Sequence, residues 1–159
     1  EEPYTLALTV LEALGGHHPD FRLLATDIST RVLETARKGV YNSAKIEPVP
    51  RPLVQKYFQK LENGPDADYQ VSDELKRIVS FNRLNLSEPP FPMKGPFDVV
   101  FCRNVMIYFD TEVRSRLVLE ICRLLKPGGY LMIGHSESLS GIVAPLTLVQ
   151  PAVYKKTAS

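Results

Sequence analysis

The segment PFDVVFCRN, residues 96–104, decides the fold class of this sequence of 159 residues. Residues 96–102 include two valines and two phenylalanines, a composition typical of a buried strand. The run ends at two polar residues, Arg103 and Asn104. The kind of sheet to which this strand belongs is indicated by the segments on either side of it.

Expected strands and helices alternate along the chain around this segment. The expected strands cover residues 21–27, 78–84, 96–102 and 130–134, and the expected helices cover 4–14, 29–37 and 111–125. Ser29 and Thr111 are suitable N-caps, and Gly39 is a suitable helix stop. Two more strands, 146–149 and 152–155, follow each other closely and predict an antiparallel edge. The pattern therefore predicts an α/β fold with a parallel sheet and an antiparallel edge strand pair.

Residues 41–78 interrupt this alternation. A proline-rich stretch leads into a short amphipathic helix, with apolar residues at 53, 54, 57, 58 and 61. An Asn63-Gly64-Pro65 turn and a short strand near 69–71 follow. We interpret residues 41–78 as a small inserted β-subdomain, antiparallel or mixed, in a domain formed by residues 1–40 and 79–159.

The composition excludes several classes of function. The net charge of +1 gives no electrostatic basis for binding nucleic acid or a membrane surface. No apolar run reaches the roughly 18 residues of a membrane helix, so we expect no membrane insertion. Cys102 and Cys122 lie in apolar segments and are expected to be buried, reduced thiols of a cytoplasmic protein.

Polar residues that suit ligand binding follow the expected strands. In open parallel sheets, ligands bind outside the carboxyl ends of the strands. The residues at these ends are Asp27, Asn85-Leu86, Arg103-Asn104 with Tyr108 one helical turn further on, and Gly134-His135-Ser136-Glu137. One edge of the sheet thus collects acids, amides, an arginine and hydroxyls, and is the expected ligand side.

Each of these residues also has a purely structural interpretation. Asp27 could accept hydrogen bonds from both ribose hydroxyls of a nucleoside, or it could help to cap the helix that starts near Ser29. Arg103 could orient an anionic substrate, or pair with Asp98 or Glu137.

Two further candidates remain open in the same way. Tyr108 could line a site or belong to the core, and His135 could act as a general base or form structural hydrogen bonds. No Cys/His spacing supports a zinc site, and GHSES lacks the frame of a nucleophile elbow.

Four stretches together carry a family resemblance: EEPYTLAL, LATDIST, FDVVFCRNVMIYFD and LLKPGGYLMIGHSESL. They resemble the chemotaxis receptor methyltransferases, the CheR-type protein-glutamate O-methyltransferases, over essentially the whole chain. The resemblance implies a doubly wound, Rossmann-like fold that binds S-adenosylmethionine (SAM) and releases S-adenosylhomocysteine. It also implies methyl-ester formation on glutamates of bacterial chemoreceptors in chemotaxis adaptation, with residues 41–78 contacting the receptor.

The resemblance also implies roles for single residues. Asp27 would bind the ribose, Glu2 would lie near the methionine part of SAM, and Asn85-Leu86 would flank the adenine. Arg103-Asn104 would contact the cofactor, and Tyr108 and Arg103 would act at the methyl-transfer position. A glutamate carboxylate, with an ordinary pKa of about 4.3, is ionised near neutral pH and needs no general base.

The family pattern leads to one more expectation. Relatives carry a helical N-terminal domain, a first strand and a Gly-rich loop, and this chain would lack all three. The strand order of the class is 3-2-1-4-5-7-6, so a gap would separate strands 2 and 4, and a swapped or closed-up sheet is expected. Two alternatives stay open: a SAM methyltransferase with another substrate, and a fragment that binds a partner without turnover.

Overall fold

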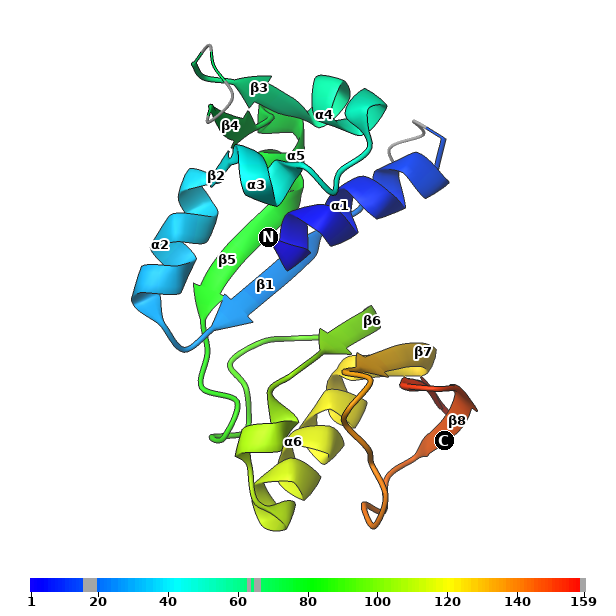
Figure 1. Ribbon diagram of the computed structural model, residues 1–159. Helices are drawn as coiled ribbons and strands as arrows, with labels where there is room; N and C mark the ends of the chain where they lie inside the picture. Colours follow the sequence, from blue (N-terminus) through cyan, green and yellow to red (C-terminus); the bar gives the residue numbers. More distant parts are fainter. Residues whose placement is uncertain (16–19, 63, 65–66, 158–159) are drawn as a thin grey trace. The chain divides into compact units, whose positions relative to one another are not determined.

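The computed structural model describes residues 1–15, 20–62, 64 and 67–157 (Figure 1). The chain divides into two compact units, Glu1–Leu84 and Asn85–Ser159, called here the N-terminal and C-terminal units. In the described ranges, no helix is long and apolar enough to cross a membrane.

The N-terminal unit contains a parallel pair of strands with two helices. The elements are α1 (Glu2–Ala13), β1 (Leu23–Asp27), α2 (Thr30–Lys38) and β5 (Val79–Arg83). β1 and β5 run in register from Leu23 opposite Val79 to Asp27 opposite Arg83. The predicted ends of α2 are confirmed: the Ser29 hydroxyl accepts a hydrogen bond from the Val32 N–H at 3.3 Å, and Gly39 ends the helix at φ 62°.

A three-stranded antiparallel sheet follows α2, in the order β2-β4-β3. Its strands are β2 (Val40–Asn42), β3 (Phe58–Lys60) and β4 (Asp68–Val71), accompanied by α3 (Ser43–Ile46), α4 (Arg51–Tyr57) and α5 (Asp73–Ile78). The predicted strand near 69–71 is confirmed. The prediction that the amphipathic helix continues through Phe58 and Leu61 is wrong, because Phe58 is extended and pairs with Val71. Of the predicted 63–65 turn, Asn63 and Pro65 lie outside the described residues.

One hydrophobic core joins the parallel pair and the three-stranded sheet. Its members come from α1, α2, both sheets and α3 to α5: Tyr4, Ala7, Leu8, Leu11, Leu33, Tyr41, Ile46, Tyr57, Val71, Leu75, Ile78, Val79 and Phe81. The Tyr4 ring packs edge-on against Tyr41 and Phe81, with ring centroids 6.3 and 5.6 Å apart. The buried Tyr57 donates a hydrogen bond to Glu12 at 2.7 Å and so fastens α4 to α1. The proposed boundary of the inserted subdomain at 41–78 stays a prediction, since this core runs across it.

The C-terminal unit is a four-stranded sheet in the order β6-β7-β9-β8. Its elements are β6 (Phe97–Cys102), the short 3₁₀ helix η1 (Met106–Tyr108), α6 (Thr111–Leu124), β7 (Leu125–Ile133), β8 (Leu146–Gln150) and β9 (Val153–Lys156). β6 and β7 are parallel, whereas β9 pairs antiparallel with both β7 and β8. The predicted antiparallel edge pair is therefore confirmed, and the mostly apolar face of α6 packs against β7.

Three details of this unit correct the sequence-based expectations. Asp110, not Thr111, is the N-cap of α6, because its carboxylate accepts the Val113 N–H at 2.8 Å. Leu125 is extended and begins β7, so this strand starts five residues before the predicted strand at 130–134. Val99 and Phe101 of β6, which lie on the same face of the strand, are each 41% exposed, so this face is only partly covered in the described chain.

The strand orders match two parts of the expected sheet. The observed pair β5-β1 corresponds to strands 3 and 2 of the family order 3-2-1-4-5-7-6. The observed order β6-β7-β9-β8 corresponds to strands 4, 5, 7 and 6 of the same family order. In the part of the chain that the structure describes, β1 pairs only with β5, and β6 only with β7. In the described chain each sheet stays within its own unit, and the swapped or closed-up sheet stays a prediction.

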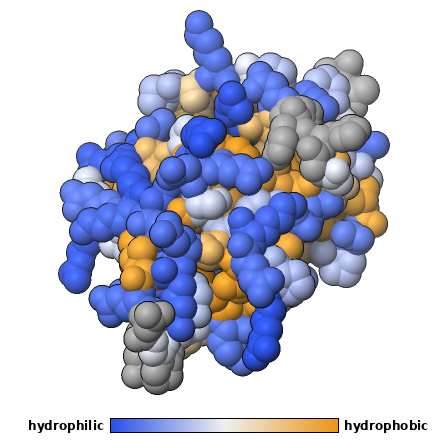
Figure 2. Space-filling view, turned by 90° about the horizontal axis from the view of Figure 1, so that it is seen from above, coloured by the Kyte–Doolittle hydropathy of each residue, from blue (hydrophilic) through white to orange (hydrophobic). Residues whose placement is uncertain are grey.

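Hydrophilic side chains cover much of the face seen in Figure 2, with apolar side chains between them. Lys and Arg number 19 and Asp and Glu 18, so the surface charges nearly balance.

Candidate active site

Asp27 lies at the carboxyl end of β1, where the parallel pair ends. Its Oδ1 accepts the backbone N–H of Ser29 at 2.8 Å, and its carbonyl oxygen accepts the N–H of Leu84 at 3.0 Å. Among the described residues, its other carboxylate oxygen has no hydrogen-bond partner. Ser29, not Asp27, provides the side-chain cap of α2. Asp27 therefore stabilises the turn before the helix through one oxygen of its carboxylate.

Two apolar side chains beside Asp27 were not singled out from the sequence. Ile28 is 54% exposed and Val32 is 51% exposed. These exposed β-branched side chains lie next to a carboxylate of which only one oxygen accepts a hydrogen bond. Apolar and polar groups therefore lie together at this edge, as they commonly do in ligand sites. The signal available in the sequence was the apolar residue directly after the acid at a strand end.

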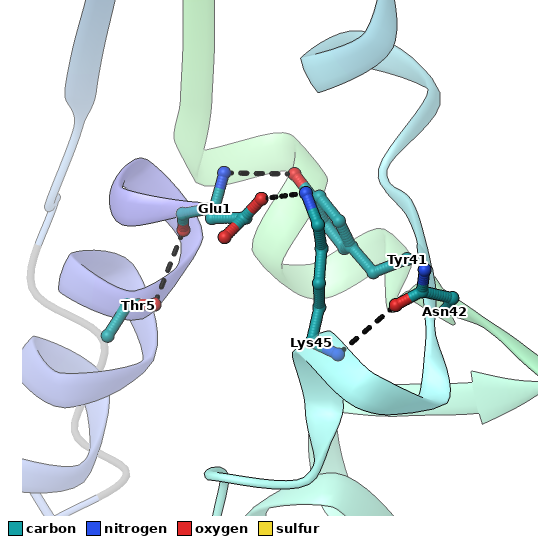
Figure 3. Close-up of polar contacts among 5 residues, drawn as sticks. All are labelled: Glu1, Thr5, Tyr41, Asn42 and Lys45. Atoms are coloured by element: carbon teal, nitrogen blue, oxygen red, sulfur yellow. Dashed lines mark hydrogen bonds and ion pairs between the residues drawn. The ribbon is translucent and has the colours of Figure 1, made fainter.

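The start of α1 is fastened to the three-stranded sheet (Figure 3). The Glu1 carboxylate forms an ion pair with Lys45 of α3, and the hydrogen bond from Lys45 lowers the pKa of Glu1. The Glu1 nitrogen lies 3.2 Å from the phenol oxygen of Tyr41, and burial raises the pKa of that phenol to about 12. Residues of the 41–78 segment thereby hold the helix turn that carries Glu2, which is exposed.

In the C-terminal unit, residues 103–108 form a short irregular segment after β6. Asn104 has a left-handed backbone, with φ 58°, and η1 follows at once. Met106 is buried at 1% exposure, whereas Tyr108 is 79% exposed. The interpretation of Tyr108 as a core residue is therefore wrong, and its phenol is open to a ligand. Arg103 is exposed on the same segment.

The carboxylates of Asp98 and Glu137 each form well-defined bonds. Asp98 pairs with Lys126, which lowers the pKa of Asp98 chiefly through their hydrogen bond. Glu137 accepts four backbone N–H groups, from Asn104, Val105, Met106 and Gly134, at 2.7–3.0 Å. The sequence placed Glu137 at the expected ligand edge and as a possible partner of Arg103, but it did not indicate these four backbone hydrogen bonds.

The remaining predicted residues of this unit have less distinctive surroundings. Asn85 Oδ1 accepts the N–H of Ser87 at 3.1 Å and its hydroxyl at 2.8 Å, which forms a local turn, and Leu86 is half-buried. His135 is exposed, and its role as a general base is untested. The described stretches contain no group of three or more His, Cys, Asp or Glu residues that could hold a metal ion.

The orders β5-β1 and β6-β7-β9-β8, each within its own unit, agree with parts of the α/β fold of SAM-dependent methyltransferases. More specifically, the chain belongs to the CheR methyltransferase family, because the model of its SAM-binding domain matches residues 1–154.

The curated relatives are chemotaxis protein methyltransferases. The chain is 43% identical to chemotaxis protein methyltransferase 2 of Pseudomonas aeruginosa over 87% of this chain and 49% of that protein. It is 43% identical to the chemotaxis protein methyltransferase of Borreliella burgdorferi over 98% of this chain and 54% of the relative. For the Salmonella typhimurium enzyme, the identity is 39% over 97% of this chain and 54% of the relative. The chain thus spans about half the length of the curated relatives it matches.

Proposed function

We propose that this chain is the SAM-binding part of a methyltransferase that forms methyl esters on glutamate side chains of chemoreceptors. The proposal rests on membership of the CheR family and on the relatives that are named chemotaxis protein methyltransferases. The single structural observation that carries it is the Asp27 carboxylate, which has one oxygen available at the carboxyl end of β1. A carboxylate in this position suits the ribose of a nucleoside cofactor.

The residues of the N-terminal unit fit SAM in its polar and apolar parts. Asp27 would accept hydrogen bonds from the ribose hydroxyls, and the exposed Ile28 would offer an apolar contact to the adenine. Glu2, in the first turn of α1, would face the methionine part of the cofactor. The fastening of this turn to Lys45 and Tyr41 would hold it in a fixed place.

The residues of the C-terminal unit would serve the adenine and the reacting groups. Asn85 and Leu86 would flank the adenine, and Asn104 would contact the cofactor. Arg103 would attract and orient the substrate carboxylate through its planar donor fork. The exposed phenol of Tyr108 would line the methyl-transfer position.

Bound SAM supplies an electrophilic methyl group, and the protein supplies alignment. A glutamate carboxylate is ionised near neutral pH, because its ordinary pKa is about 4.3, so no residue has to remove a proton. Arg103 and Tyr108 then act by placing the carboxylate in line and by excluding water. This explains why the site needs neither a nucleophile triad nor a pair of carboxylates.

The β2-β4-β3 sheet is our candidate for the receptor contact. It is a separate antiparallel sheet, and its outer strands β2 and β3 each have one strand neighbour in the described chain. An outer strand leaves backbone N–H and C=O groups open for pairing with an added peptide strand. Residues 41–78 would therefore recognise the substrate protein rather than the cofactor.

Methyl transfer from radiolabelled SAM to cytoplasmic fragments of chemoreceptors tests this function. We expect base-labile label on the receptor fragment, and loss of this label when the accepting glutamates are replaced by glutamine. Label on small carboxylic acids, but none on receptor fragments, would overturn the assigned substrate. A calorimetric titration that detects no SAM binding would overturn the function altogether.

A further inference from the structure

The Glu137 carboxylate connects two loops that lie about thirty residues apart in the sequence. Oε2 accepts the N–H groups of Gly134 at 2.7 Å and of Asn104 at 2.9 Å. Oε1 accepts those of Val105 at 3.0 Å and of Met106 at 2.9 Å. The Glu137 N–H donates to the Gly134 carbonyl oxygen at 2.9 Å, so the turn after β7 is closed on itself as well.

The backbone of the first loop is shaped for an anion. Asn104 is left-handed at φ 58°, and Val105 returns to the right-handed region at φ −117° and ψ −42°. Successive residues of opposite hand point their N–H groups into one concavity, which binds negative charge. The carboxylate of Glu137 fills this concavity, and asparagine is among the residues that best tolerate the left-handed conformation.

The fit on the other side of the carboxylate is equally close. A Cβ atom on Gly134 would lie 2.7 Å from Glu137 Oε2 and 3.2 Å from the Asn104 nitrogen. An added Cβ would therefore displace the carboxylate from its present position between the two loops. The spacing of Gly134 and Glu137 in the GHSE motif therefore lets the Glu137 carboxylate bind the backbone of both loops, an arrangement called here the Glu137 bridge.

We propose that Glu137 is a positioning residue for the methyl-transfer segment. Through the N–H groups of Asn104, Val105 and Met106, it fixes the backbone from which Arg103 and Tyr108 project. This inference rests on the proposed function, which assigns those two residues to the transfer step. Glu137 itself touches neither cofactor nor substrate in this role.

The sequence offers a matched control in the same unit. The Glu120 carboxylate, 7% exposed, accepts the Phe91 N–H at 2.7 Å and two hydrogen bonds from Arg123. Replacing Glu120 also removes hydrogen bonds to a carboxylate, but it leaves the hydrogen bonds of the 104–106 amides in place. Comparing Glu137→Gln with Glu120→Gln therefore separates positioning of the segment from general stability. Gly134→Ala provides a second route, because it keeps Glu137 and displaces its carboxylate.

Amide hydrogen exchange measured by NMR tests the anchoring without any need for activity. In Glu137→Gln and in Gly134→Ala, we expect the amides of 104–106 to exchange about tenfold or more faster, since hydrogen bonds to charged groups are the strong ones. The amide of Leu131 in β7 serves as the internal reference and is expected to keep its rate. In Glu120→Gln, the amides of 104–106 are expected to exchange as in the unaltered protein.

Methyl transfer to receptor fragments, measured below the unfolding temperature of every variant, tests the consequence. We expect kcat to fall about tenfold or more in Glu137→Gln and Gly134→Ala and to stay within about twofold in Glu120→Gln. Unchanged exchange of 104–106 in Glu137→Gln would overturn the anchoring. Faster exchange with unchanged kcat would overturn the positioning role. If the unaltered protein does not bind SAM, the proposed function fails together with the catalytic consequence, while the exchange data still decide the anchoring.

Discussion

The carboxylate of Asp27 accepts the backbone N–H of Ser29 at 2.8 Å. The two interpretations of Asp27, as a helix-start acid and as a ribose ligand, are therefore compatible, because this bond uses Oδ1 alone. We predict that Asp27→Ala weakens SAM binding about 10- to 100-fold, since it removes hydrogen bonds to a charged group. Isothermal titration calorimetry with the purified protein measures this change directly.

Ser29→Ala is the matched control for that measurement. It removes the side-chain cap of α2, the bond from the Val32 N–H, and should lower the free energy of unfolding by about 1 kcal/mol. SAM affinity should stay close to that of the unaltered protein. An equal loss of affinity in both variants would show that Asp27 acts through the helix start and not through the ribose.

We predict that Tyr108→Phe lowers turnover more than it lowers SAM affinity. Tyr108 is 79% exposed, so loss of its hydroxyl should leave the fold intact. A hydroxyl that acts only when the substrate and the methyl group are aligned changes kcat and not cofactor binding. Single-turnover methyl transfer and SAM titration on the same preparation separate the two quantities. Equal losses in both would contradict a role in the transfer step.

Periodicity predicted the regular elements of the fold well, because local patterns determine them. Ser29 and Gly39 bound α2 as expected, since a hydroxyl cap and a left-handed glycine are local devices. The end of α4 was missed for the opposite reason. Phe58 continues the helical spacing of its neighbours, but pairing with Val71, thirteen positions away, makes it a strand residue.

The sequence indicated which residues are candidates for the site, but it did not indicate the hydrogen bonds that hold their backbone in place. Asp27, Asn104 and Tyr108 could be singled out because they follow the ends of expected strands, and their roles stay predictions. The backbone hydrogen bonds of Glu137 were not predicted, because backbone N–H groups have no signature in the sequence. The available signals were an asparagine after a strand, where a left-handed backbone is tolerated, and a glycine three residues before a glutamate.

Glu120 gives a prediction about stability at acidic pH. Its pKa is lowered, chiefly by the hydrogen bond from Arg123 and further by the Phe91 N–H, against the opposing effect of burial. The charged form therefore stabilises the fold at pH values above the unfolded-state pKa of about 4.3, and this contribution is lost as the pH falls through the lower folded-state pKa.

We predict that Glu120→Gln lowers the free energy of unfolding by about 1–3 kcal/mol at pH 7. The reason is that Phe91 and Arg123 lose the charged acceptor of their hydrogen bonds. The difference from the unaltered protein should shrink as the pH falls below about 4. Urea unfolding at pH 7, 5 and 3.5 measures it. Glu112→Gln, at an exposed site in the first turn of α6, is the control and should change stability little at any of these pH values. A difference that stays constant down to the lowest pH would contradict the assigned charge state.

The two cysteines should be unreactive while the protein is folded. Burial raises the pKa of Cys102 to about 12, with a smaller contribution from the nearby Glu137 carboxylate, and burial also raises the pKa of Cys122. Since the thiolate is the reactive form and an ordinary thiol has a pKa near 8.5, the thiolate fraction of Cys102 at pH 8 should fall about a thousandfold. We therefore expect iodoacetamide to label neither residue at pH 8 on a timescale on which it labels both in 6 M guanidinium chloride. Mass spectrometry of peptides containing each cysteine measures this, and rapid labelling of Cys102 in the folded protein would contradict the burial of this end of β6 beneath the Glu137 bridge.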